Sequence, residues 1–159
     1  MVDVVDRETR SRMMANIRGR DTKPEMLVRR MLHGAGYRYR LHDGQMPGRP
    51  DIVLPRHRVA ILVHGCFWHR HSGCRLCTTP ATRAEFWRDK FSANVERDQR
   101  NSASLVTSGW RVATIWECAL KGKARSEWAQ TLLDWMKATG PAKSQTIEIG
   151  AEPTAGRHP

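Results

Sequence analysis

Apolar residues recur along the chain with two different periods, and the order of these periods predicts the secondary structure. A helical spacing predicts a helix that begins near Thr22 and ends at Gly34. Thr22 and Glu25 are spaced as in a capping box, and Pro24 is tolerated so early in a helix. The buried stripe of this helix would consist of Leu27, Val28, Met31 and Leu32. Further helices are expected over residues 8–19, over 82–107 after a second capping box at Thr82 and Glu85, and near 125–138.

Short apolar or alternating runs between these helices predict strands. They cover residues 37–41, 51–54, 58–63 and 110–116. The resulting order is helix, helix, three strands, helix, strand, helix, which predicts an α/β fold with a mixed central sheet flanked by helices. We expect one domain over residues 1–139. The Pro, Gly, Ala and Ser content after Gly140 predicts a flexible tail over 140–159.

The charge of the chain adds an expectation about its partner. It has 27 Lys and Arg against 16 Asp and Glu, a formal net charge of +11. A surface this basic attracts polyanions, and nucleic acid is the first candidate. The longest apolar stretch, Val59 to Val63, is far shorter than the ~20 residues of a spanning helix. Residues 1–6 are acidic and too short for a secretory signal, so we expect a cytoplasmic protein.

The segment from His64 to Cys74 concentrates metal-ligating and aromatic side chains. A candidate Cys3His zinc site consists of Cys66, His71, Cys74 and Cys118. Cys77 follows Cys74 by three positions and could replace a neighbouring thiolate. Two other interpretations stay open, namely a set of free buried thiols and a disulfide.

Asp51 stands at the entry of a predicted strand, directly after Gly48-Arg49-Pro50. A carboxylate in this place can hold Mg2+ against a scissile phosphate, because Mg2+ prefers oxygen ligands and keeps waters. An aspartate in a tight turn is the alternative. Glu25, His64 and His69 are available nearby, and a histidine such as His69 can take a proton from water, unless it is a surface residue.

Two aromatic pairs, Phe67-Trp68 and Phe86-Trp87, accompany basic residues. Flat side chains beside positive charges can stack on bases or enter between base-pair steps. Core packing is the alternative: we expect it for Phe86, and it stays open for Trp87. Met14 on the basic first helix is a further candidate wedge, with packing as its alternative.

Five motifs together resemble the very-short-patch-repair (Vsr) DNA mismatch endonucleases. The motifs are Pro47-Gly48-Arg49-Pro50-Asp51, His64-Gly65-Cys66-Phe67-Trp68-His69, Thr82-Arg83-x2-Phe86-Trp87, Asn94-Val95-x-Arg97-Asp98 and Gly109-Trp110-Arg111-Val112-x3-Trp116-Glu117-Cys118. The resemblance spans about residues 7–120. It implies a restriction-endonuclease-like fold with a structural zinc, and a Mg2+-dependent nick 5′ of the thymine in T:G mismatches left by deaminated 5-methylcytosine.

The resemblance also implies roles for individual residues. Asp51 and the main-chain carbonyl of Val63 would bind Mg2+, and His69 would activate water with Glu25 bonded behind it. His64 and Asp98 would support them. The implied zinc ligands are Cys66, His71, Cys74 and Cys118, and the implied DNA contacts are Met14, Phe67, Trp68, Trp87, Lys90 and Asn94. The family often has Thr where this chain has Val63, but a backbone ligand does not depend on the side chain.

Three functional hypotheses follow. The first is a monomeric strand-specific nicking endonuclease for T:G mismatches, with other mismatch-repair proteins as further partners. The second is a non-catalytic zinc module that binds DNA, which leaves Asp51, His69 and Glu25 without a role. The third is a restriction-type endonuclease that cuts both strands, for which a dimer is expected.

Overall fold

The computed structural model describes residues 6–9, 20–121 and 127–151. Its helices are α2 (Lys23–Gly34), α3 (Ala84–Thr107) and α4 (Trp128–Lys137), with short 3-10 helices η1 (Glu117–Leu120) and η3 (Gly140–Ala142). Its strands are β1 (Arg40–Leu41), β2 (Ile52–Leu54), β3 (Val59–His64), β4 (Arg111–Trp116) and β5 (Thr146–Ile149). The mixed α/β class is thereby confirmed. Of the helix expected over 8–19, residues 10–19 lie outside the described part of the chain.

The strands form a mixed sheet in the order β1-β2-β3-β4-β5. The pairs β1/β2 and β2/β3 are antiparallel, with Ile52 opposite Ile61. The pairs β3/β4 and β4/β5 are parallel, and the first of them sets Val63 opposite Ile115. This register brings the start of β2 beside the end of β3, so Asp51 and the segment after His64 meet at the same end of these two central strands.

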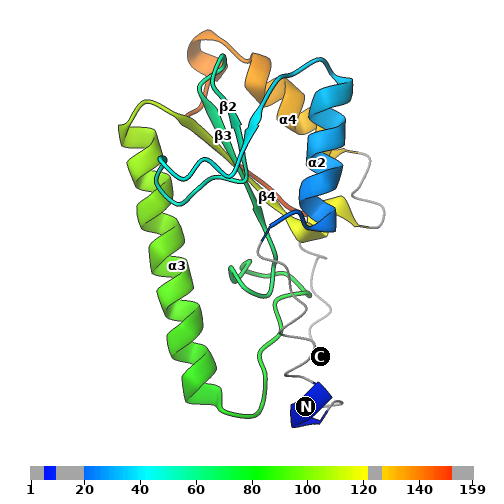
Figure 1. Ribbon diagram of the computed structural model, residues 1–159, viewed down its shortest axis with the longest axis vertical. Coiled ribbons are helices and arrows are strands. Elements are labelled where there is room, and N and C mark those ends of the chain that lie inside the picture. The colour runs from blue at the N-terminus through cyan, green and yellow to red at the C-terminus, as the bar shows by residue number, and fades with distance from the viewer. Residues whose placement is uncertain (1–5, 10–19, 122–126, 152–159) are drawn as a thin grey trace.

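The two faces of the sheet carry different helices (Figure 1). On one face, α2 and α4 pack over the strands through residues that include Val28, Leu32 and Leu132. On the other face, α3 contacts the sheet near its C-terminal end, where Leu105 packs with Ala60, Leu62 and Val112. The N-terminal part of α3 extends beyond the sheet toward the loop after β3 (Figure 1). The strands that carry the site are therefore supported by a core on both faces.

The two predicted capping boxes have different outcomes. Thr22 is the N-cap of α2, and its Oγ1 accepts a hydrogen bond from the N–H of Glu25 at 3.3 Å. The second box is wrong: α3 begins after Arg83, which has a left-handed backbone (φ 58°) and no side-chain capping hydrogen bond. Residues with such a backbone are uncommon outside glycine, and sequence spacing alone did not reveal it.

The prediction of a flexible tail is wrong for residues 140–151. They form η3 and the edge strand β5, in which Val112 of β4 pairs with Thr146. The strand is only four residues long and follows a Gly-, Pro- and Ser-containing run; its Ile149 is buried in the core and its Ile147 packs against the core. The strand expected over 37–41 is shorter than predicted and covers only Arg40–Leu41.

Within the described residues, no helix has the length and apolar composition that crossing a membrane requires.

Candidate active site and Cys/His cluster

Asp51 lies immediately before β2, and its carboxylate turns toward the neighbouring strand. Its Oδ2 accepts a hydrogen bond from the N–H of Val63 at 2.7 Å. Burial raises the pKa of Asp51 to about 7, against the lowering effect of the Val63 hydrogen bond, and nearby Glu25 raises it further. A buried carboxylate that is costly to ionise alone is suited to a cation, which stabilises its charged form.

Glu25 reaches the same region from the first turn of α2 and is 3% exposed. Its Oε2 accepts hydrogen bonds from the Asp21 N–H at 3.0 Å and from Arg29 Nη2 at 3.1 Å. His42 lies between Glu25 and Asp51: its Nε2 is 3.5 Å from Glu25 Oε2, and its Nδ1 is 4.0 Å from Asp51 Oδ1. The two carboxylates therefore share one histidine as a neighbour.

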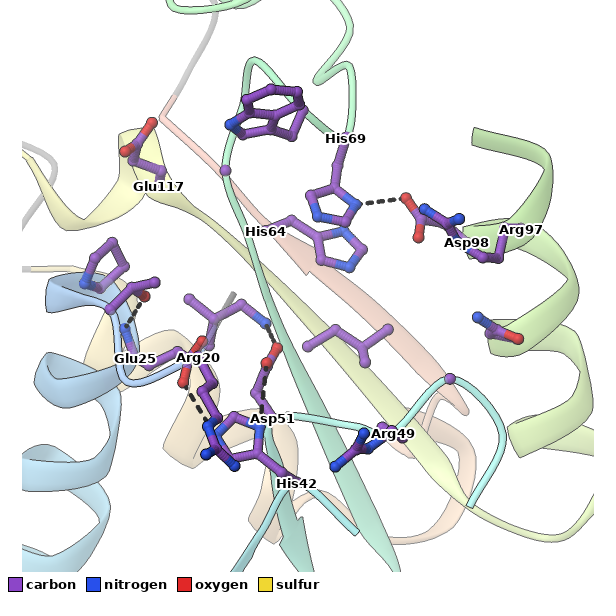
Figure 2. Close-up of a pocket in the computed structure, with 18 residues that line it drawn as sticks. Arg20, Glu25, His42, Arg49, Asp51, His64, His69, Arg97, Asp98 and Glu117 are labelled. Atoms are coloured by element: carbon purple, nitrogen blue, oxygen red, sulfur yellow. Dashed lines mark hydrogen bonds and ion pairs between the residues drawn. The ribbon is translucent and has the colours of Figure 1, made fainter. Parts of the chain in front are cut away.

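His64 and His69 lie on the other side of Asp51 (Figure 2). Their rings stack with centroids 3.8 Å apart, and His69 Nδ1 is 2.6 Å from Asp98 Oδ2 on α3. Burial lowers the pKa of His64 to about 3, and the neighbouring His69 contributes in the same direction. His64 therefore stays neutral at physiological pH.

The structure changes one expected contact. Glu25 was expected behind His69, but the carboxylate that bonds His69 is that of Asp98. Glu25 instead contacts Asp21 and Arg29, because α2 approaches from the opposite side of the site. Asp98 thus has a direct contact to the candidate base, which the sequence indicated only as general support.

These side chains line one cavity of about 1080 Å3 (Figure 2). Basic residues from three separate segments also line it, and they are Arg20, Arg49 and Arg97. The Arg49 loop is held close to α3 by Gly48, where an added Cβ would lie 2.7 Å from Asn101 Nδ2 and the backbone φ is +73°. Only glycine fits this approach. The cavity therefore combines carboxylates, a histidine–carboxylate pair and positive charge.

The Cys/His cluster predicted for zinc comes together in space. Ligand atoms of Cys66, His71, Cys74 and Cys118 all lie within 4.8 Å of one another. His71 Nδ1 is 3.7 Å from Cys66 Sγ and 3.4 Å from Cys118 Sγ. All four cysteines are free, so the structure contains none of the disulfides that the sequence left open. Cys77 is not part of this group. The set of three thiols and one imidazole fits a tetrahedral metal site.

The protonation state of His71 agrees with a metal as the partner of this cluster, whereas the thiols would have to release their protons. Burial raises the pKa of the Cys66 and Cys118 thiols, and burial lowers the pKa of His71, so its imidazole is neutral. A neutral imidazole is the form that ligates a metal, and metal binding displaces the thiol protons. His71 also stacks on Trp116, with ring centroids 4.3 Å apart.

The segment after β5 covers the cluster. The N–H of Ala151 donates a hydrogen bond to Cys118 Sγ at 3.2 Å. A Cβ on Gly150 would lie 2.6 Å from His71 Cε1, so a side chain at this position would displace the imidazole. These contacts went unpredicted, since the segment had been assigned to the tail.

The aromatic residues form one group beside the site. Phe67 contacts Trp68, Trp87 and Phe91 with ring centroids 5.0–5.8 Å apart. The expectation of core packing for Phe86 is wrong, because Phe86 is 43% exposed whereas Trp87 is 6% exposed. Helix α3 turns the side chain at position 87 toward the Phe67 loop and the side chain at 86 outward.

The other predicted DNA contacts lie around this aromatic group. Lys90 Nζ is 5.7 Å from the centroid of the Trp68 ring, and Asn94 Nδ2 donates to the Trp68 carbonyl at 3.1 Å. Both residues therefore support the loop that carries Trp68 in the DNA-free protein. Met14 lies outside the described residues.

Sequence reasoning missed two residues of the site, Arg29 and His42. A signal existed for Arg29, which follows Glu25 by four positions on the same helix face as Val28 and Leu32. A charged pair on an apolar face indicates a functional or buried ion pair. His42 had no such signal, since its position depends on a left-handed backbone at φ 47°.

Comparisons with known proteins find a DNA mismatch endonuclease and nicking enzymes as relatives of this chain. A family model described as DNA mismatch endonuclease Vsr matches residues 2–75. The DNA mismatch endonuclease Vsr of Escherichia coli is 48% identical over 125 residues, which cover 79% of this chain and 80% of that protein. A type II nicking enzyme of Xanthomonas oryzae pv. oryzae is 48% identical over 120 residues, 76% of this chain and 88% of the relative. Another, from Neisseria meningitidis, is 42% identical over 78% of this chain and 88% of the relative.

Proposed function

This chain belongs to the family of Vsr DNA mismatch endonucleases, and from that premise we propose that it nicks one strand of DNA 5′ of the thymine in a T:G mismatch. The reaction would be Mg2+-dependent hydrolysis of a phosphodiester, carried out by a monomer with a restriction-endonuclease-like core. Such mismatches arise from deaminated 5-methylcytosine. The observation that carries the proposal is the meeting of Asp51, Glu25 and the His69–Asp98 pair in one cavity with a basic lining.

Asp51 and the main-chain carbonyl of Val63 would hold the Mg2+. The ion would supply Lewis-acid stabilisation of charge at the scissile phosphate. The fit is supported by the donor chemistry, since Asp51 is a mostly buried carboxylate with one oxygen bonded to the Val63 N–H. The basic residues Arg20, Arg49 and Arg97 would bind the DNA backbone around it.

His69 would take the proton of the attacking water. A carboxylate accepts only, so the 2.6 Å contact with Asp98 fixes the proton of neutral His69 on Nδ1. This leaves Nε2 as the basic nitrogen. His64, stacked on His69 and neutral, adds no positive charge beside the imidazolium that forms.

The aromatic group would provide the mismatch recognition. Phe67, Trp68 and Trp87 would enter the duplex from the major-groove side, with Met14 from the minor groove and Lys90 and Asn94 as contacts. Unstacking a base step costs a few kcal/mol, and a mismatched step resists less. Trp87 is 6% exposed, so its entry would require the contacts with Phe67 and Trp68 to open.

The decisive experiment compares matched and T:G duplexes with separately labelled strands, in Mg2+. We expect nicking of the thymine strand in the T:G duplex alone, and an Asp51→Ala variant that binds DNA but does not nick it. Equal cutting of both duplexes would refute mismatch specificity. Equal cutting of both strands would favour a restriction-type enzyme, and binding without nicking by the wild type would favour the non-catalytic module.

Asp98→Asn is expected to lower the single-turnover rate of nicking by about 100-fold, the size typical of an impaired general base. The amide can no longer hold the His69 Nδ1 proton as a carboxylate does, and the imidazolium loses its charge partner. Single-turnover nicking measures the rate, and DNA affinity should stay within about two-fold of wild type. Glu96→Gln, an exposed change on the same helix, is the control. A normal rate in Asp98→Asn would contradict the role given to the pair.

A further inference from the structure

Arg29 is a charged residue buried inside the fold beside the candidate active site. It lies on α2, is 7% exposed, and approaches three side chains with a single nitrogen. Its Nη2 is 2.7 Å from Asp21 Oδ1, 3.1 Å from Glu25 Oε2 and 3.1 Å from His42 Nε2. Burying a charge is costly unless it is paired, and here two carboxylates pair it.

The three partners of Arg29 are themselves a set of metal-ligand types. Ligand atoms of Asp21, Glu25 and His42 all lie within 4.8 Å of one another. The guanidinium nitrogen lies within 3.1 Å of one atom of each, so a cation belonging to the protein already lies among them. The carboxylate of Asp51 differs in this respect, because its ion-pair partner within the described part of the chain is a histidine, His42.

The contact with Arg29 also orients His42. A guanidinium has donors only, so the His42 nitrogen that faces it at 3.1 Å is the acceptor, Nε2. The proton of the neutral ring is then on Nδ1, which faces Asp51 Oδ1 at 4.0 Å. The 3.5 Å approach of His42 Nε2 to Glu25 is longer than the Arg29 contact, so we assign that nitrogen to Arg29.

The backbone links the same groups. The N–H of His42 donates to the Asp51 carbonyl at 3.3 Å, and the N–H of Asp21 donates to Glu25 Oε2. His42 and Asp21 both have left-handed backbones, at φ 47° and φ 57°. Such conformations persist when the surroundings fix them. Arg29 contacts both of these segments, and so does Glu25, which Arg29 itself holds.

We propose that Arg29 is a positioning residue of the nicking reaction. Its guanidinium occupies the site among Asp21, Glu25 and His42 where a metal cation could otherwise bind. It thereby holds Glu25 and His42 in fixed positions relative to Asp51. The inference rests on the nicking activity proposed above. It assigns no contact between Arg29 and substrate, since Arg29 acts through Glu25 and His42.

The test compares Arg29→Met, Arg29→Lys and the control Arg30→Met, an exposed change at the next position of the same helix. Single-turnover nicking in Mg2+ should fall by about 100-fold in Arg29→Met, the size expected when reacting groups are displaced by about 1 Å. Arg29→Lys keeps the charge and should recover most of the rate. Arg30→Met should match wild type, and DNA affinity should change less than about two-fold in all three.

A second readout does not depend on nicking. Removing the guanidinium leaves two carboxylates and an imidazole without their cation, so Arg29→Met should bind one more Mn2+ per chain than wild type in an electron paramagnetic resonance titration. Arg29→Lys and Arg30→Met should not. Absence of nicking by wild type would refute the proposed function, whereas this titration would still report on Arg29.

The proposal is overturned if folded Arg29→Met nicks within about two-fold of wild type, or if Arg29→Lys loses as much rate as Arg29→Met. An unchanged Mn2+ stoichiometry in Arg29→Met would overturn it as well. Should Arg29→Met fail to fold, Asp21→Asn takes its place, because the Asp21 side chain is 52% exposed and holds the guanidinium at 2.7 Å. A several-fold loss of rate there supports the proposal, and an unchanged rate overturns it.

Discussion

Replacing Asp51 by asparagine is expected to abolish nicking and, at the same time, to make the Mg2+-free protein more stable at pH 8. The asparagine amide would keep an oxygen for the Val63 N–H but would lack the charge that Mg2+ requires. The nicking rate should fall by at least about 1000-fold, since the lost metal supplies several kcal/mol to the transition state.

The gain in stability follows from the raised pKa of Asp51. Its pKa in the folded protein is about 7, mainly because of burial, against an ordinary value of 3.8. A raised folded-state pKa contributes stability that is fully present below the unfolded pKa and is lost as the pH rises through 7. At pH 8 the charged carboxylate therefore costs roughly 4 kcal/mol relative to a neutral group, and at pH 5 less than about half of that.

Urea unfolding of wild type and Asp51→Asn at pH 5 and pH 8, without added Mg2+, measures this difference. The variant should gain more at pH 8 than at pH 5, and Mg2+ should stabilise the wild type alone. Asp134→Asn, an exposed change on α4, should alter neither. If Asp51→Asn were less stable than wild type at pH 8, the ionised Asp51 carboxylate would not lower the free energy of unfolding, contrary to the expectation.

The second large effect concerns the Cys/His cluster, for which we propose one structural zinc per chain. Cys66→Ser should lose the metal and unfold at a temperature lower by more than about 10 °C, because structural zinc sites contribute on the order of 10 kcal/mol at neutral pH. Cys66 is fully buried between β3 and the 3-10 turn that bears Cys118. Losing the metal therefore disconnects two core segments.

Elemental analysis and thermal unfolding provide the measurements, with Cys77→Ser as the matched control. Cys77 is outside the cluster, so its variant should keep one zinc and an unchanged unfolding temperature. Retention of zinc by Cys66→Ser, or its loss in Cys77→Ser, would contradict the ligand set Cys66, His71, Cys74 and Cys118.

Elements with strong local patterns were predictable from the sequence. The helix α2 begins after its Thr22 cap as expected, and every bound of β2, β3 and β4 lies within one residue of its predicted position. Asp51, His64 and His69 come together because the pairing of β2 with β3 fixes their positions, and both strands are continuous apolar runs.

Features that depend on distant contacts were not predictable. β5 alternates polar and apolar residues over only four positions, which is too short a pattern to reveal a strand without its pairing with β4. Core packing was expected for Phe86 and left open for Trp87, and the structure buries Trp87 instead, in a helix that begins after a left-handed Arg83. Glu25 was expected to contact His69, but Asp98 does so, because the side from which α2 approaches the site cannot be read from the sequence.

The hydrogen bond from Ala151 to Cys118 bears on the order in which the Cys/His cluster is completed and covered. The four cluster residues are translated before Gly150 and Ala151, more than thirty residues earlier in the case of Cys118. The zinc that we propose for this cluster could therefore bind before these two residues cover one side of the cluster. Once β5 pairs with β4, Gly150 and Ala151 lie against His71 and Cys118 and cover that side of the cluster. We therefore expect β5 to slow the release of the proposed zinc without supplying any of its ligands.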